Sequence, residues 1–443
     1  MGCCVPCIWL SISATMLVNS CLVIPYSNLS RIFRIKDSEE DNQSEKEIFH
    51  IRKVEIRDMG FAMKNYEFDR PVYEEGGIDW NDLDVKDINL DALELQFKGG
   101  IMSGEGRSLS FREKSGYIVE HMSGTARVGR GKTIVEDLHI DDPWSDVHLP
   151  LFMMSYADIH AFKDFIAEVK LDGDISESRL DFKTLSYFAP ELIGNDLKLE
   201  VSGKMSGCVD DFIISDIDIN SLSGGFSGKV EGRLKGLPYI ESTWIEAELK
   251  DFSVTSRGVG DFISEWMSEN SSLDISDIAE GTVFHLDATG RGMMNALALN
   301  ADIRSQIGNA SASVKLENIV NPGKQIGISG KVQTEDLDLG SIIGTEILGP
   351  ATLNAGMNAK LGSGKHPSEI TIDTLRIDRL QANAYDYSNI TAVGKISSNS
   401  FDGRIVCHDP NLNFLLQGTF ALSAKTQNAR YKFFTNIGHA DLN

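Results

Sequence analysis

Two short segments come close to motifs that bind phosphate or calcium. Val128-Gly-Arg-Gly-Lys-Thr133 has the Gly-Lys-Thr ending of a phosphate-binding P-loop, but Ala126 stands where that loop requires its first glycine. Asp216-Ile-Asp-Ile-Asn220 has the opening spacing of a calcium-binding EF-hand loop, but its twelfth position is Ser227 instead of a bidentate glutamate. We therefore interpret the first segment as a hairpin turn, and the second as a strand with its isoleucines inward and its acids outward.

The sequence offers no arrangement for hydrolysis or metal binding. Its 9 histidines form no His-x-x-x-His pair, and no Gly-x-Ser-x-Gly nucleophile elbow is present. Cys4-Val-Pro-Cys7 has the spacing of a redox pair, but it opens an apolar segment instead of a strand-to-helix turn. Carboxylates alternate with apolar residues, as in Glu369-Ile-Thr-Ile-Asp373, which is typical of a solvated sheet face. We predict a non-enzymatic protein without catalytic residues, metal or cofactor; a carbohydrate-active β-protein is the enzymatic alternative.

Composition narrows the class of protein further. A formal net charge of -23 argues against nucleic acid as a partner, because binding to phosphates requires clustered Lys and Arg. Outside the first apolar stretch the body contains only Cys208 and Cys407, so a disulfide framework is excluded. The 40 glycines and 11 prolines suit turns between many strands.

The dominant pattern is an alternation of apolar and polar residues with period two. In Ala351-Thr-Leu-Asn-Ala-Gly-Met-Asn-Ala-Lys-Leu361 every odd position is apolar. Such runs break at turn residues, as in Ser223-Gly-Gly225, Asn321-Pro-Gly323 and Gly362-Ser-Gly364. We expect an all-β protein, a long antiparallel amphipathic sheet curled into a groove (β-taco-like), with a few short helices, among them segments near 155–169 and 259–267.

These patterns divide the chain into five segments. The first is uncharged and mostly apolar, and it is interpreted as a membrane anchor, a signal segment or a misassigned start. The others are a charged linker, a first β-rich segment, a short helical connection and a second β-rich segment. The predicted bounds are 1–30, 31–48, 49–255, 256–281 and 282–443.

Several stretches resemble a known family. Asp336-Leu-Asp-Leu-Gly-Ser-Ile-Ile-Gly344, followed by Leu348–Leu361, is similar to the repeating segments of TamB and AsmA-like envelope proteins. Asp137–Asp146, Leu185–Pro190 and Gly236–Thr243 resemble phrases typical of TamB-like proteins of the Bacteroides group. The resemblance extends from about Phe49 to Phe420 and includes no catalytic motif.

The resemblance implies a periplasmic protein anchored in the inner membrane, whose β-taco groove bridges the inner and outer membranes. Two roles follow from it: phospholipid transport along the groove, and assembly or secretion of outer-membrane proteins with a TamA-type barrel partner. Full members of the family are longer and continue into a C-terminal module that meets this partner. Because the chain ends at Asn443 without that module, we expect a fragment.

The inward residues of the alternating strands are the predicted working surface. An oily sheet face must be buried by a second layer or by an apolar ligand such as a phospholipid acyl chain. The predicted groove lining is Leu197, Leu199, Val201, Phe284, Leu286, Ala351, Leu353, Ala355, Met357, Ala359 and Leu361. The alternative is a structural or adhesive surface protein, in which stacked β-repeats form a closed core.

Overall fold

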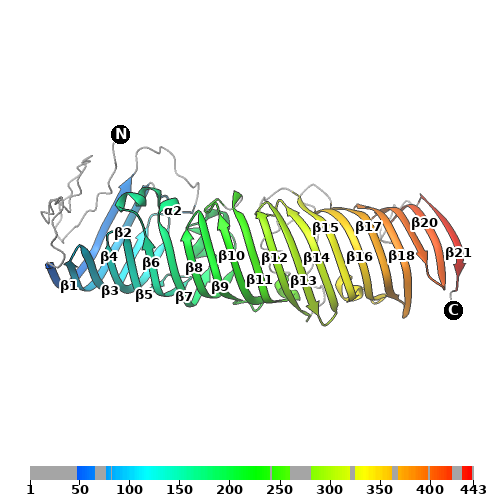
Figure 1. Cartoon of the computed structure of the whole chain (residues 1–443), viewed down its shortest axis with the longest axis horizontal. Coiled ribbons are helices and arrows are strands. Elements are labelled where there is room, and N and C mark those ends of the chain that lie inside the picture. Colours follow the sequence, from blue (N-terminus) through cyan, green and yellow to red (C-terminus); the bar gives the residue numbers. More distant parts are fainter. Residues whose placement is uncertain are drawn as a thin grey trace. The chain divides into compact units, whose positions relative to one another are not determined.

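The computed structural model describes residues 47–64, 76–80, 82–239, 242–259, 281–319, 325–361, 368–397, 400–421 and 432–441. Over these residues the chain is nearly all β, which confirms the predicted fold class. The strands form a 21-stranded antiparallel sheet in which no described pairing closes a barrel, and the helices are few and short (Figure 1). Contacts divide the chain into two compact units, Met1–Ile217 (unit 1) and Asp218–Asn443 (unit 2), which are described separately.

In unit 1 each strand from β1 to β8 pairs with the next along the chain. The strands are β1 (Glu47–Lys64), β2 (Asp82–Lys98), β3 (Ile101–Glu113), β4 (Ile118–Gly129), β5 (Lys132–Asp141), β6 (Asp146–Ser155), β7 (Lys170–Asp181) and β8 (Lys198–Cys208). Helical turns η1 (Ile159–Asp164) and α2 (Phe165–Glu168) lie between β6 and β7, which confirms the helical turns expected there. Helices α3 (Phe182–Ser186) and η2 (Pro190–Leu192) lie between β7 and β8.

Unit 2 continues the same pattern after β9 (Asp211–Ser221), the strand in which the division falls. Its strands are β10 (Phe226–Lys235), β11 (Trp244–Thr255), β12 (Val283–Met293), β13 (Ala296–Ser305), β14 (Gly308–Glu317), β15 (Ile326–Asp338), β16 (Leu348–Leu361), β17 (Glu369–Ala382), β18 (Tyr385–Ser397), β19 (Ser400–His408), β20 (Leu412–Ala421) and β21 (Lys432–Ala440). Helix α5 (Leu339–Ile343) joins β15 to β16. From β10 onward each strand pairs with the next.

One face of the unit 2 sheet is apolar across successive strands. Residues directly opposite one another on antiparallel strands share a face, so the register identifies its members. A single row crosses the strands in the order Val230, Leu249, Ala288, Ala301, Ala312, Val332, Ala355, Leu375, Ala392, Ile405 and Leu416. We call the side of the sheet that carries this row the apolar face, and the other side the polar face.

Unit 1 also has an apolar face. Its last row at one end of the strands is Phe97, Met102, Val128, Thr133, Met154, Leu171 and Gly207, each opposite the next. Only Thr133 in this row carries a polar side chain. The period-two alternation in the sequence therefore places apolar residues on one side of the sheet in both units.

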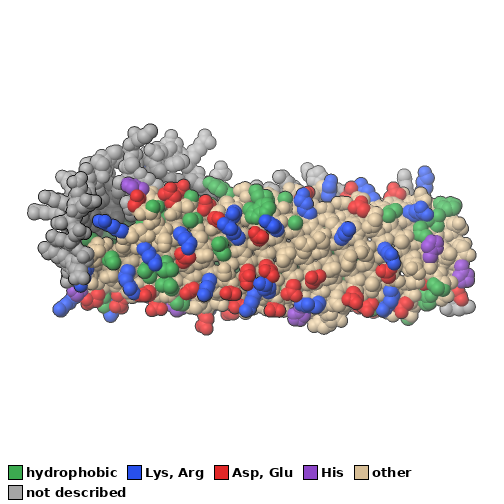
Figure 2. All heavy atoms as spheres, in the orientation of Figure 1, with side chains coloured by type: hydrophobic (Ala, Val, Ile, Leu, Met, Phe, Trp, Pro, Cys, Tyr) green, Lys and Arg blue, Asp and Glu red, His purple; other side chains and the backbone are tan. Residues whose placement is uncertain are grey.

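The polar face of unit 2 carries cross-strand ion pairs. Arg304 on β13 lies 2.7 Å from Asp287 on β12, and Lys395 on β18 lies 2.7 Å from Glu369 on β17. The face seen in Figure 2 has acidic and basic side chains interspersed over the strands, with hydrophobic side chains scattered between them. Each exposed pair contributes about 0–1 kcal/mol, so these charges mainly keep this face solvated.

Glycines bring neighbouring strands of unit 2 close together at one place on the apolar face. Gly394, Gly403 and Gly418 lie directly opposite one another on β18, β19 and β20. A Cβ atom added to Gly403 would lie 2.3 Å from the Val393 carbonyl oxygen and 2.6 Å from Cζ of Phe401. The bare backbone therefore leaves room for the Phe401 ring, which is 4% exposed.

The turn predictions hold where the structure describes them. Arg130 and Gly131 form the two-residue turn between β4 and β5, at the segment that ends like a P-loop. The EF-hand-like segment is part of β9, with Ile217 buried at 6% exposure while Asp216 and Asp218 are exposed. Residues 222–225 form the turn before β10.

Other predicted features fall partly or wholly outside the described residues. These are the apolar segment and linker at 1–46, the turns at 321–323 and 362–364, and most of the helical connection at 256–281. Of that connection, residues 256–259 are helical and residue 281 lies in a turn.

Candidate functional site

The predicted lining residues of unit 2 share the apolar face. Leu286 and Leu353 occupy one row, because Leu286 lies opposite Ile303, Ile303 opposite Ala310, Ala310 opposite Thr334, and Thr334 opposite Leu353. Phe284 lies on the same side of β12 as Leu286, two residues earlier. The remaining predicted residues all lie on β16 on the side of Leu353: Ala351, Ala355, Met357, Ala359 and Leu361.

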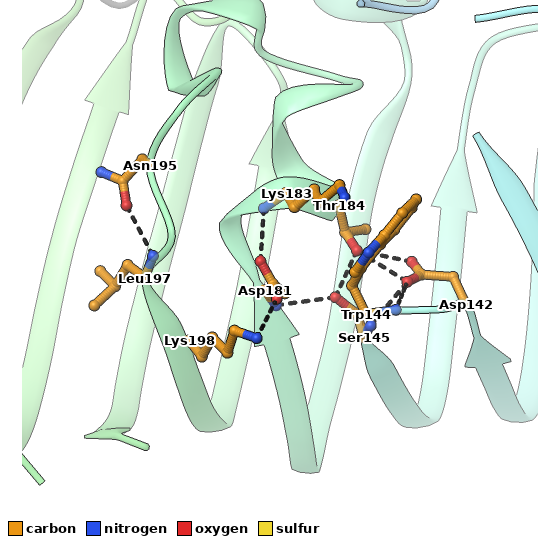
Figure 3. Close-up of polar contacts among 9 residues, drawn as sticks. All are labelled: Asp142, Trp144, Ser145, Asp181, Lys183, Thr184, Asn195, Leu197 and Lys198. Carbon is orange, nitrogen blue, oxygen red and sulfur yellow. Dashed lines mark hydrogen bonds and ion pairs between the residues drawn. The ribbon is translucent and has the colours of Figure 1, made fainter. Parts of the chain in front are cut away.

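In unit 1 two of the three predicted residues lie within a strand. Leu199 lies opposite Leu180 and Val201 lies opposite Ser178, so both side chains belong to the side of β8 that also carries Met205. Leu197 precedes β8, and its backbone N–H donates to Oδ1 of Asn195 at 3.0 Å (Figure 3). Leu197 is therefore part of the connection between β7 and β8.

Burial on the apolar face of unit 2 is uneven, and large side chains such as Ile377 and Phe401 are buried while others are not. The fully buried members include the small residues Ala288, Ala301, Ala351, Ala359 and Ala392, which are at most 8% exposed. Several larger side chains on the same face are only half-buried, among them Leu286, Leu353, Met357, Ile372 and Leu375. A closed sandwich fills the roughly 10 Å between its sheets with its largest side chains. Among the described residues no second sheet covers this face.

A buried polar network holds the connection between β7 and β8 in unit 1. We call this connection, residues 182–197, the strap. The Thr184 hydroxyl on α3 donates toward Oδ2 of Asp142 at 2.9 Å, and Asp142 also accepts the N–H groups of Trp144 and Ser145 at 2.8 Å each (Figure 3). Asp142 and Ser145 are 5% and 2% exposed, so their hydrogen bonds are shielded from water.

A second carboxylate, that of Asp181 at the end of β7, holds the start of the strap. Asp181 caps α3 by accepting the N–H of Lys183 at 2.8 Å, and its own N–H donates to Oγ of Ser145 at 2.9 Å. Lys198 lies 3.3 Å from the same carboxylate (Figure 3). The Lys183 ammonium group lies 4.5 Å from the centre of the Trp144 ring. These contacts fix the strap against the turn between β5 and β6.

The strap places aromatic side chains over the apolar face of unit 1. Tyr187 packs on the buried group of Ile78, Tyr117 and Val119, which are 3%, 8% and 1% exposed. Its carbonyl oxygen accepts the N–H of Ile78 at 2.8 Å. Burial raises the pKa of Tyr117 to about 12, and the Asp142 carboxylate adds to the shift. The strap therefore packs over this end of the face.

Histidines form the nearest approach to a cluster of metal-ligating side chains. On the polar face of unit 1 the His139 ring lies 6.0 Å from that of His121 and 6.3 Å from that of His148. His139 Nε2 is 2.7 Å from Oδ1 of Asp146. Within the described residues, no group of His, Cys, Asp and Glu side chains is placed to hold a metal ion.

The helices that the structure describes include none with the length and apolar character needed to cross a membrane. Comparison with protein-family models, with curated proteins and with solved structures finds no match to this chain.

Proposed function

We propose that this chain is a non-enzymatic lipid-handling protein of the cell envelope, whose apolar sheet faces bind phospholipid acyl chains. In this proposal it moves phospholipid between the inner and outer membranes, supports the assembly or secretion of outer-membrane proteins, or does both. One observation carries the proposal: on the apolar face of unit 2 several large aliphatic side chains, among them Leu286, Leu353 and Met357, are only half-buried, and no second sheet covers them among the described residues. A face of this kind has apolar surface left for a ligand.

The energetics suit an acyl chain. Each buried methylene contributes roughly 0.8 kcal/mol, so about ten methylenes lying along a row would contribute about 8 kcal/mol. That corresponds to a Kd of about a micromolar before the cost of ordering the chain is subtracted. The rows contain aliphatic and aromatic groups and glycine, apart from isolated threonine and serine hydroxyls. They would therefore bind apolar chains in general and would not select one head group.

The alternative is a structural spacer whose oily face is sealed by its own side chains. That reading requires the apolar side chains to be buried along the whole of the face. Met357, between Gly330 and Ile372 in its row, is half-buried instead. The half-exposure of such side chains favours the lipid-handling proposal over the spacer.

Substitution of Met357 by aspartate tests the proposal. We expect Met357→Asp to lower the phospholipid bound per chain at least about twofold, because desolvating a carboxylate on the apolar face costs several kcal/mol. Native mass spectrometry and lipid extraction of the full chain, purified from a diderm bacterial host, measure the bound lipid.

Asn354→Asp is the matched control, because Asn354 lies on the polar side of the same strand, opposite Gln333 and Arg376. Circular dichroism establishes that each variant is folded, and the uncharged Met357→Gln replaces the aspartate variant if that one unfolds. A folded Met357 variant that keeps the wild-type lipid content, or a wild-type chain without lipid, would refute the proposal.

A further inference from the structure

The apolar face of unit 1 ends differently at the two ends of its strands. The connections that follow odd-numbered strands lie at one end, the odd rim, and those that follow even-numbered strands lie at the other, the even rim. At the odd rim the strap covers the face, and Tyr187 packs on Val119 and Tyr117. At the even rim the last row includes Met102, which is 42% exposed. The strap thus lies over the face at the odd rim, although its own Phe188 and Ile193 are 38% and 53% exposed, while no such strap lies over Met102 at the even rim among the described residues.

Apolar side chains are exposed in the connection between β6 and β7, at the even rim. Phe162, Phe165 and Ile166, in η1 and α2, are 38%, 37% and 39% exposed, and the rings of Phe162 and Phe165 lie 6.1 Å apart. We call these three residues the lip. An exposed apolar patch marks a site of interaction with a protein, a ligand or a membrane.

The lip is anchored from below. Ala161 and Val169, which flank its aromatic residues in the chain, are 3% and 0% exposed. The backbone N–H of Asp210, between β8 and β9, donates to the Ile166 carbonyl oxygen at 3.2 Å. The helical turn is thus fixed to the sheet while its aromatic side chains face solvent.

Tyr156 connects the lip to the apolar face. Its ring lies 4.8 Å from that of Phe162, and its hydroxyl lies 3.0 Å from Oγ1 of Thr133, a member of the last row. The same hydroxyl donates to the carbonyl oxygen of Gly129. Tyr156 therefore links Phe162 of the lip to the last row of the apolar face.

From this arrangement we propose that the lip docks on a phospholipid bilayer and is the point where acyl chains enter the apolar face of unit 1. The inference rests on the proposed lipid-handling function and adds the place and direction of entry. Phenylalanine and isoleucine at an exposed turn insert readily at the boundary between head groups and acyl chains. Asp158, Asp164 and Glu168 in the same segment are exposed, so a zwitterionic bilayer surface with no net charge suits the lip better than an anionic one.

The test separates the uptake of lipid from a bilayer from the binding of lipid once it is on the apolar face. The double variant Phe165→Glu, Ile166→Glu introduces carboxylates at exposed positions, so we expect the fold to be retained. Stopped-flow fluorescence measures the rate at which the full chain extracts an acyl-labelled phosphatidylcholine from phosphatidylcholine vesicles. A separate measurement gives the equilibrium occupancy after loading from detergent micelles, where no bilayer has to be engaged.

We expect the double variant to extract lipid at least about tenfold more slowly, with unchanged occupancy after micellar loading. Ile343→Glu is the control, because Ile343 on α5 is 62% exposed and lies outside the lip. Wild-type extraction by the double variant, or equal slowing in the control, would overturn the inference and leave the proposed function standing. A wild-type chain that takes up lipid from neither source would overturn both. If the glutamates unfold the chain, the double variant Phe165→Ser, Ile166→Ser replaces it, with the same expected slowing of extraction and the same contradicting results.

Discussion

At the scale of single residues, two buried aspartates perform the same task in the two units. Asp142 and Asp409 each precede a proline and open a turn, and their N–H groups donate to the carbonyl oxygens of Ser145 and Leu412 at 2.9 and 3.1 Å. Each carboxylate then binds a neighbouring element. Thr184 donates to Asp142, while Tyr385 and Ser388 of β18 donate to Asp409.

The environment of Asp409 shifts its titration. Burial is the largest single influence and acts to raise the pKa of this carboxyl, but the hydrogen bonds from Asn411, Tyr385 and Ser388 together outweigh it. The net result is a pKa below the usual value, so the charged form is favoured in the folded state. Asp409 therefore stabilises unit 2 above pH 4 or so, and this contribution is lost as the pH falls through its lowered pKa.

Tyr117 has the opposite effect on pH dependence: its contribution to stability is lost as the pH rises. Its pKa of about 12 lies above the ordinary value of 10.0, so the folded state holds the phenol proton more tightly than the unfolded state. Its stabilising effect is complete below pH 10 and is lost as the pH rises through about 12. A shift of this size corresponds to about 3 kcal/mol.

We expect Tyr117→Phe to flatten the alkaline loss of stability of unit 1 between pH 10 and about 12. Chemical denaturation followed by fluorescence across this range measures the effect against the wild-type chain. Tyr239→Phe, at a side chain that is 64% exposed, controls for the loss of a phenol elsewhere. Parallel pH profiles for the wild type and Tyr117→Phe would contradict the assignment.

At the scale of strands, a bulge recurs at an acidic residue. Asp58, Asp251 and Asp336 have φ values of 50°, 47° and 47° and lie at shifts in strand register. Their N–H groups donate to side-chain oxygens of Asn89, Asp287 and Thr352 on the following strand, each at 3.2 Å. Aspartate tolerates this left-handed conformation better than most residues, which explains its use inside a strand.

The glycine row gives a prediction about strand packing. Gly403→Val should destabilise unit 2 by about 3 kcal/mol or more, because its side chain would collide with the backbone of β18 and with the Phe401 ring. Gly290→Ala is the matched control: a Cβ there meets only the Leu297 side chain, at 3.7 Å. Urea denaturation measures the free energy of unfolding of the two variants. Equal values for Gly403→Val and Gly290→Ala would show that the glycine row tolerates side chains.

The sequence predicted the strands better than their irregularities. Alternation over 351–361 identified β16 and its apolar side, because a strict period of two assigns each residue to a face. The bulges were not predicted, because an Asp followed by an apolar residue, as in Asp251-Phe and Asp336-Leu, also occurs where the register is regular, as in Asp302-Ile. The strap also escaped, because the contact between Thr184 and Asp142 joins residues 42 positions apart. The Asp-Pro pairs at 142 and 409 were the available signal for the turns.

At the scale of the whole molecule, both units combine a polar face with an apolar one. The central claim is that this apolar face is a surface for acyl chains and not a sealed core. The claim depends on side chains of β16 that alternate between the two faces, so it can be tested residue by residue along one strand.

The most direct test is photo-crosslinking of the full chain with a phospholipid that carries a diazirine near the end of its acyl chain, followed by peptide mass spectrometry. We predict adducts on Leu353 and Met357 and on Ile372, the row neighbour of Met357, with none on Asn354 or Asn358 of the polar face. Adducts spread equally over both faces, or none on β16 and β17 in a folded chain that carries the lipid, would contradict the account.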